Sequence, residues 1–163
     1  MDLEFLEETA YPAMLSLSKF YSKALKPHGD LLLVEPSASP EQTTTPKQVK
    51  GMPGHIKGKN YITAGCTFDQ GFVWESYSDT LAMAAELGNK DPFLDTIREQ
   101  LTKLDPVLVG ASGQIKEYRE EKNYSDIGQE RHRHISHLCT LFPGTLIKSN
   151  QPEWMQAASK TLD

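Results

Sequence analysis

The stretch Arg131–His137, which reads RHRHISH, holds three of the chain's five histidines and interleaves them with arginines. A zinc site needs three or four ligands in a defined geometry, and this stretch has no carboxylate and no HExxH or CxxC spacing. Arginine and neutral histidine supply hydrogen-bond donors at fixed angles, which suits hydroxyl-rich or anionic ligands. The pattern therefore favours one wall of a polar pocket. A metal site and a solvated helix start stay open as alternatives.

One glutamate, Glu41, follows a proline-flanked serine pair in the stretch LLLVEPSASPEQ. Pro36 and Pro40 restrict the backbone on both sides of the serines and can aim Glu41 at a fixed point. A carboxyl group held beside apolar residues has a raised pKa, which suits a general acid. The alternative is an ordinary solvated glutamate on a surface loop.

Two further stretches carry polar side chains that suit a binding site. In GCTFDQGFVWE, Asp69 and Gln70 stand at the start of a predicted helix, where an acid commonly serves as an N-cap or first-turn residue. In GQIKEY, Gln114, Glu117 and Tyr118 combine an amide, a carboxylate and an aromatic ring. Such groups are typical of sugar sites, and they also occur on many protein surfaces.

The composition disfavours several classes of function. The chain has 163 residues and a net charge of −5, whereas a nucleic-acid surface needs clustered lysine and arginine. We therefore expect no nucleic-acid partner. No apolar run reaches the roughly 18 residues that span a bilayer, so no membrane contact is expected. The acidic start MDLEFLEE lacks the basic region of a secretory signal, and the localisation stays open.

The cysteine pattern bears on the redox state of the chain. Cys66 and Cys139 are the only cysteines, and they lie far apart without CxxC spacing. One disulfide is possible in principle. The pattern favours two buried free thiols.

The elements that position these residues begin with an amphipathic helix over residues 3–26. Asp2 can cap it, Pro12 should kink or divide it, and Pro27 with Gly29 should stop it. Apolar residues at three- and four-residue steps mark the face that we expect to be buried. This face contains Leu3, Leu6, Ala10, Met14, Leu17, Tyr21 and Leu25.

Residues 31–34 form an apolar run that is too short to distinguish a strand from a buried helix. A proline-rich loop follows from residue 35 to about residue 64, and its length indicates disorder or function. A second helix is predicted from Thr67 or Asp69 to Gly88. Its expected buried stripe contains Phe72, Val73, Tyr77, Leu81, Ala84 and Leu87.

A third helix is predicted after Asp91 and Pro92, with Phe93, Ile97, Leu101 and Leu104 as its apolar positions. Residues 107–131 are less regular. The stretch HISHLCTLF has helical spacing up to Pro143, and a last helix should start after Asn150. This helix reaches the end of the chain without a cap, which indicates truncation. The sequence thus predicts antiparallel helix pairs with apolar faces that need further helices to cover them.

Taken in order, four of these stretches resemble motifs of the family 95 glycoside hydrolases, the inverting α-L-fucosidases and α-L-galactosidases. That family shows P-S-x-S-P-E-N, then G-x-T-M-D-x-Q, then G-Q-L-Q-E-W, and finally H-R-H-x-S-H-L-x-x-L-x-P-G. The corresponding segments here are Pro36–Gln42, Gly65–Gln70, Gly113–Tyr118 and His132–Gly144. The resemblance covers most of the chain.

The resemblance implies an all-α fold in which residues 1–163 are the middle helices of an (α/α)6-barrel catalytic domain. It implies that Glu41 is the general acid and that His132, Arg133 and His134 bind the sugar. On the same basis we assign substrate binding to His137, Asp69, Gln70 and Glu117. No metal and no cofactor is implied.

The family's water-activating groups lie in an N-I-N-type motif upstream and a Q-I-D-G-N-F-G-type motif downstream, and neither motif occurs in this chain. An inverting glycosidase needs its acid and base on opposite faces of the sugar, roughly 6.5–9.5 Å apart when both are carboxylates. We therefore expect the isolated chain to be inactive. Its partners should be a fucosylated or L-galactosylated oligosaccharide and the remainder of the parent catalytic domain.

Several positions depart from the family pattern, namely Gln42, Phe68, Tyr118, Cys139 and Thr140. None of them removes a proposed catalytic group, but they leave the choice between fucose and galactose open. Two other functions stay possible from the sequence. One is a non-catalytic carbohydrate-binding or degenerate helical module, and the other is a histidine-ligated metalloprotein.

Overall fold

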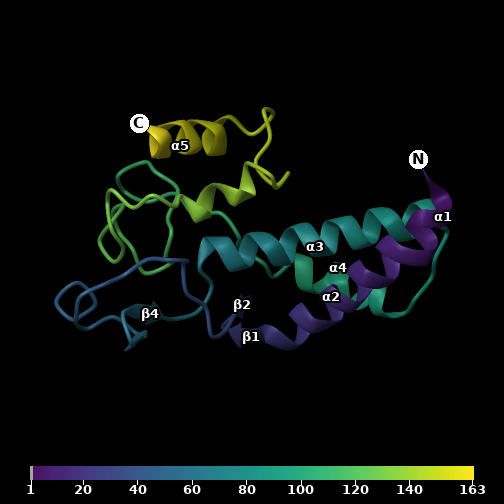
Figure 1. Ribbon diagram of the computed structural model, residues 1–163, viewed down its shortest axis with the longest axis horizontal. Coiled ribbons are helices and arrows are strands. Elements are labelled where there is room, and N and C mark those ends of the chain that lie inside the picture. The colour runs from purple at the N-terminus through teal and green to yellow at the C-terminus, as the bar shows by residue number, and fades with distance from the viewer. Residues whose placement is uncertain (1) are drawn as a thin grey trace.

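The computed structural model describes residues 2–163, and it is built around one long helix (Figure 1). This helix, α3 (Thr67–Glu86), packs against the N-terminal helix α2 (Tyr11–Ala24) and against α4 (Phe93–Leu101). It also contacts a short 3₁₀-helix, Ser136–Thr140. The central helix therefore joins the N-terminal half of the chain to the histidine-rich segment.

The predicted N-terminal helix forms, and its winding changes just before Pro12. Helix α1 (Leu3–Phe5) continues into a π-helical turn, Leu6–Ala10, and α2 follows directly. Asp2 caps the start as expected, since its Oδ1 accepts a backbone N–H of the first turn at 3.0 Å. Proline lacks the N–H that regular winding would use here, and a π-turn accommodates that loss.

The buried face of this helix differs from the predicted stripe. Tyr11 and Ser18 are buried, whereas Leu3 is 55% and Leu17 is 38% exposed. The extra residue in the π-turn rotates the following side chains by about 100° relative to a regular α-helix. Helix α2 then meets α3 through hydroxyl groups, with Ser18 Oγ 2.9 Å from Thr80 Oγ1. The predicted stripe is therefore only partly right: Leu6 and Leu25 are buried as expected, whereas Leu3 and Leu17 are not.

The first helix ends earlier than predicted because the next residues are extended. Strand β1 (Leu25–His28) pairs antiparallel with β2 (Leu31–Val34), so the apolar run LLLV is a strand. Gly29 makes the turn between the strands with a φ of +62°. Leu25 pairs with Val34, which ends the helix at Ala24 and not at residue 26.

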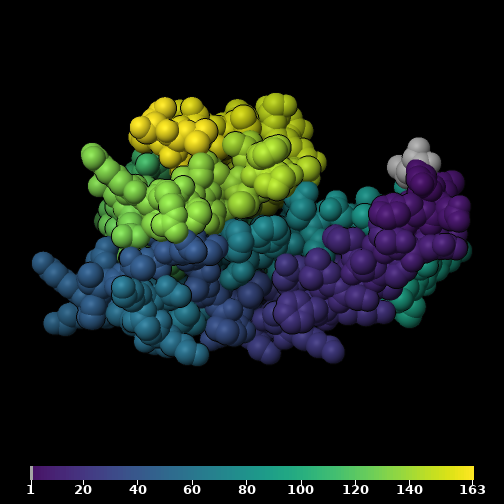
Figure 2. Space-filling view, viewed as in Figure 1, coloured from purple at the N-terminus to yellow at the C-terminus, as the bar shows by residue number. Residues whose placement is uncertain are grey.

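The prediction of an all-α fold is confirmed in part, because a second small hairpin accompanies the helices. Strand β3 (His55–Lys57) pairs antiparallel with β4 (Asn60–Ile62) inside the long proline-rich loop. In the space-filling view the blue part of this loop forms one end of the molecule (Figure 2). Residues 2–163 are thus mostly helical with two short hairpins. The strands escaped prediction because three- and four-residue strands give too few alternating positions to recognise.

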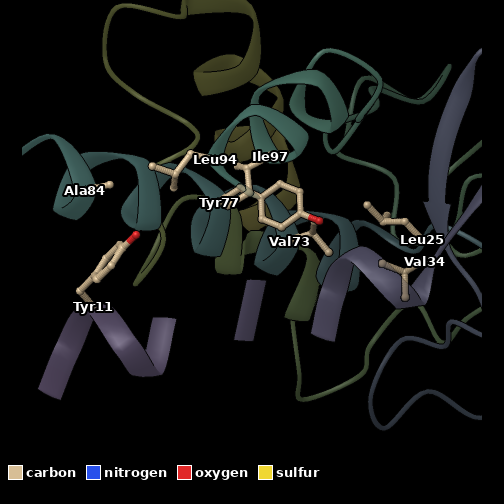
Figure 3. Packing of buried hydrophobic residues seen from close by; sticks show 8 residues of the cluster. All are labelled: Tyr11, Leu25, Val34, Val73, Tyr77, Ala84, Leu94 and Ile97. Carbon is tan, nitrogen blue, oxygen red and sulfur yellow. The ribbon is translucent and has the colours of Figure 1, made fainter. Parts of the chain in front are cut away.

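The main hydrophobic core lies between α2, α3, α4 and the first hairpin (Figure 3). As predicted, Val73, Tyr77 and Ile97 are buried, and Gly88 has a φ of +62° just after α3. Phe72 is a wrong prediction: it is 39% exposed and packs edge-on against Phe68, with ring centroids 4.6 Å apart. The remaining members of this core are Tyr11, Leu25, Val34, Ala84 and Leu94.

The C-terminal third has little regular structure before its last helix. Residues 107–131 contain only an isolated bridge between Val109 and Ile115 within the part of the chain described here. The predicted helix in HISHLCTLF is shorter than expected, the 3₁₀-helix Ser136–Thr140. Helix α5 (Pro152–Leu162) packs over this region and forms a second core. In Figure 1 the 3₁₀-helix lies between α5 and α3.

Candidate active site

The turn Pro36–Gln42 is fastened to the start of α3 by its first serine. The backbone of Ser37 pairs with that of Thr63 through two hydrogen bonds of 2.8 Å. Its hydroxyl donates to Asp69 Oδ2 at 2.6 Å and accepts the Cys66 N–H at 3.0 Å. Serine hydroxyls can donate and accept at once, so one side chain holds both the helix start and the turn.

The second serine of the turn points into the protein interior. The Ser39 hydroxyl donates to Glu117 Oε1, and both residues are only 2% exposed. Gln42 is fully buried, and its Oε1 accepts the Gln129 N–H at 2.8 Å. Hydrogen bonds to other segments of the chain therefore hold the residues on both sides of Glu41.

Glu41 itself points to the surface and meets the histidine-rich segment. Its Oε2 accepts hydrogen bonds from the Arg133 guanidinium and from His134 Nε2, the latter at 3.1 Å. The backbone is joined as well, since Ser136 Oγ donates to the Pro40 carbonyl at 2.8 Å. Both side-chain contacts use Oε2, which leaves Oε1 available to a ligand.

The surroundings of Glu41 lower its pKa. The hydrogen bond from His134 is the largest cause, and the positive charge of Arg133 is the next. The predicted raised pKa is wrong for this chain because the carboxyl group lies in solvent beside basic groups, not against apolar ones. In this arrangement Glu41 is ionised at neutral pH.

His132 lies next to His134 and faces the same open pocket as Glu41. The backbone N–H of His134 donates to His132 Nδ1 at 3.1 Å, and the centroids of the two imidazole rings are 5.2 Å apart. The pocket is wide and open to solvent, and its walls carry carboxylate, hydroxyl, amide, imidazole and guanidinium groups. It is lined by Glu41, Thr43, Gln129, Arg131, His132 and Arg133.

His137 and Glu117, which we assigned to substrate binding, lie beneath this surface. His137 is fully buried, and within residues 2–163 neither ring nitrogen has a hydrogen-bond partner. Its Nδ1 lies 3.8 Å from Glu117 Oε1. The structure therefore separates the polar residues into an exposed layer around Glu41 and a buried layer around Glu117.

The buried layer contains a second carboxylate, Glu121, that the sequence gave no reason to select. Glu121 is 1% exposed, and its Oε2 accepts the backbone N–H groups of Glu117 and Tyr118 at 3.0 and 3.1 Å. Burial raises the pKa of Glu121 to about 7. It stands in the charged run REEK, a pattern that is typical of exposed surface and that hides its burial.

Asp69 and Gln70 are held by the protein itself. Asp69 is half-buried in the first turn of α3, and burial raises its pKa despite the hydrogen bond from Ser37. Gln70 is fully buried: its Oε1 accepts the Val34 N–H at 2.8 Å and its Nε2 donates to the Leu32 carbonyl at 3.2 Å. Gln70 thus ties α3 to β2 and does not reach the open pocket.

Other candidate features can be placed in the same way. Among residues 2–163, no group of three or more His, Cys, Asp or Glu side chains is arranged to hold a metal ion. Over the same range no helix is long and apolar enough to cross a bilayer. Cys66 and Cys139 are free thiols as predicted, although only Cys66 is fully buried.

Comparisons with known proteins identify the family of this chain. The sequence model described as the Glycosyl hydrolase family 95 catalytic domain matches residues 1–163, and the chain belongs to this family. Alpha-L-fucosidase 2 of Arabidopsis thaliana is 30% identical over 99% of this chain. Probable alpha-fucosidase A of Aspergillus niger is 30% identical over 91%, and its namesake from Aspergillus oryzae is 34% identical over 75%.

The chain spans a small part of these relatives, namely 18%, 17% and 15% of their respective lengths. The match therefore establishes a fragment of a fucosidase-family catalytic domain. The activity of the whole protein is a matter for proposal.

Proposed function

We propose that this chain is part of the catalytic domain of an inverting α-L-fucosidase-like hydrolase in which Glu41 is the general acid. The observation that supports this most is the position of Glu41 on a turn whose other polar side chains are held by hydrogen bonds to distant segments. A rigid turn presents one carboxylate, with Oε1 uncommitted, to an open pocket. General acid catalysis requires such a fixed and accessible group.

His132 and Arg133, which line this pocket, and His134, which hydrogen-bonds to Glu41 beside it, provide the donors that would hold sugar hydroxyls. Arg133 and His134 are engaged with Glu41 in the free protein and keep its pKa low. A bound sugar that draws these donors to its own hydroxyls, and that excludes water, raises the pKa of Glu41. Substrate binding and protonation of the acid are coupled in this proposal.

The proposed parent fold is an (α/α)6 barrel that contains these helices. Large apolar side chains on the surface support this idea, since their burial by further helices would be favourable. They are Leu3, Phe5, Phe20, Phe142 and Leu162, with exposures of 55%, 57%, 62%, 83% and 61%. The remainder of the catalytic domain would cover these side chains and supply the groups that activate water.

The test is the variant Glu41→Gln in the full-length protein, with an exposed glutamate, Glu86→Gln, as matched control. On a fucoside with a poor leaving group, kcat/KM should fall by about 10²–10⁴-fold, the usual contribution of a general acid. On an activated aryl fucoside, which needs little protonation, the loss should be much smaller. Equal losses on both substrates would count against the acid role. Residues 1–163 alone should show no turnover.

A second candidate, a carbohydrate-binding module without catalysis, is favoured by the low pKa of Glu41, because an ionised carboxylate can accept hydrogen bonds from sugar hydroxyls. This function predicts that the full-length protein binds L-fucose and releases no product from any fucoside. In that case Glu41→Gln would weaken sugar affinity, as measured by calorimetry.

A further inference from the structure

The buried carboxylate of Glu117 stands directly under the turn that carries Glu41. Ser39 donates its hydroxyl hydrogen to Glu117 Oε1 across 78 residues of sequence. Ser39 is also two positions before Glu41, so any movement of this serine is transmitted to the carboxylate through a very short stretch of backbone. No ligand contact is available to Glu117 itself, because it is 2% exposed.

Glu117 is in turn held from its own side. Its backbone N–H donates to Glu121 Oε2 at 3.0 Å. Gly128 packs closely against the side chains of Gln42 and Glu117. A Cβ added at Gly128 would lie 2.9 Å from Gln42 Oε1 and 3.3 Å from Glu117 Oε2. Gln42, on the other side of Glu41, therefore lies in the same buried region as Glu117. Buried contacts thus hold the turn on both sides of Glu41.

We propose that Glu117 is a positioning residue that sets the orientation of the Glu41 carboxylate through Ser39, and that it does not contact the sugar. This inference rests on the proposed function, and it replaces the substrate-binding role that the sequence suggested for Glu117. Ser39 and Glu117 are both buried, so water does not compete for the hydrogen bond between them. In the buried environment of Ser39 it restricts the turn more than solvent-exposed contacts would.

The inference is tested with Ser39→Ala and Glu117→Gln in the full-length protein, and with the exposed serine Ser149→Ala as control. A misplacement of about 1 Å can reduce a rate by about 10²-fold. Ser39→Ala should lower kcat by about 10–10²-fold on a fucoside with a poor leaving group, with KM unchanged. Much less should be lost on an activated aryl fucoside. Glu117→Gln should have a smaller effect, since an amide oxygen still accepts from Ser39.

The double variant Ser39→Ala/Glu117→Gln should be no slower than Ser39→Ala alone, because Glu117→Gln acts only on a contact that Ser39→Ala has already removed. A merely structural contribution would instead reduce the rates on both fucosides equally and the two effects would add. Additive losses, or losses independent of the leaving group, would overturn the proposal. Thermal unfolding of each variant verifies that the compared proteins are folded.

A second readout does not depend on catalysis. In ¹³C NMR, the titration midpoint of the Glu41 carboxyl should move upward in Ser39→Ala, because the released turn loosens the contacts with Arg133 and His134 that keep this pKa low. An unchanged midpoint overturns the positioning role, even if Glu41 proves to be the acid. A shifted midpoint together with no effect of Glu41→Gln on turnover sinks the proposed function and leaves the positioning role in place.

Discussion

His134 and Glu41 are separated by 93 residues and are joined by a hydrogen bond of 3.1 Å between Nε2 and Oε2. This contact, more than any other, lowers the pKa of the glutamate. It also connects the two segments that carry the polar chemistry of the chain, the proline-flanked turn and the histidine-rich stretch. The charge on Glu41 is therefore controlled by a residue that the sequence assigned to sugar binding.

Replacing His134 by alanine should raise the pKa of Glu41 toward its ordinary value. The interaction favours the ionised carboxylate, so its loss makes the proton bind more tightly. The titration midpoint of the Glu41 carboxyl should then move to a higher pH. The ¹³C NMR shift of the Glu41 carboxyl measures this, with the exposed His55→Ala as control. A downward movement, or none, would contradict the assigned cause.

Glu121→Gln should flatten the dependence of stability on pH. The folded pKa of Glu121 is about 7 against an ordinary value of 4.5, so its contribution is fully present below about pH 4.5 and is lost as the pH rises through 7. Without the substitution, the free energy of unfolding should fall by about 3 kcal/mol across this pH range. The amide should keep the contacts with the Glu117 and Tyr118 N–H groups. Urea unfolding at pH 5 and pH 8 should show a smaller difference for the variant.

Gln70→Ala should destabilise the protein by about 2 kcal/mol, because it leaves a buried N–H and a buried carbonyl of β2 without partners. The exposed Gln156→Ala serves as a matched control and should change stability by less than about 0.5 kcal/mol. Chemical denaturation provides the measurement. If Gln70→Ala instead weakens sugar binding at unchanged stability, the substrate-binding assignment made from the sequence is the better one.

Gly71→Ala should destabilise the contact between α3 and the 3₁₀-helix. A Cβ at Gly71 would lie 2.5 Å from Thr140 Cγ2, whereas alanine is otherwise the better helix former. We expect a loss of about 1–3 kcal/mol from this overpacking. Thr140→Ser removes the opposing methyl group and should restore most of the stability in the double variant. Failure of the second change to rescue the first would place the strain elsewhere.

Much of the helical framework could be predicted from local signals. Asp2 at the first helix start, Asp91 before α4 and Gly88 after α3 behave as their residue types indicate. These features are local because a cap or a left-handed glycine acts within one helical turn. The order of four motifs also pointed to the family to which the chain belongs. The sequence alone therefore determined several helix starts and ends and the class of protein, but not the helix end at Ala24 or the short 3₁₀-helix Ser136–Thr140.

Only the tertiary structure decided which polar residues face solvent. The sequence placed Glu41, His134, His137 and Glu117 on one sugar pocket, whereas the fold exposes the first two and buries the others. Burial depends on contacts between segments far apart in the chain, such as Ser39 with Glu117, and no local pattern encodes them. The pKa of Glu41 was mispredicted for the same reason. Its value follows from the two basic side chains that folding brings to it, not from its neighbours in sequence.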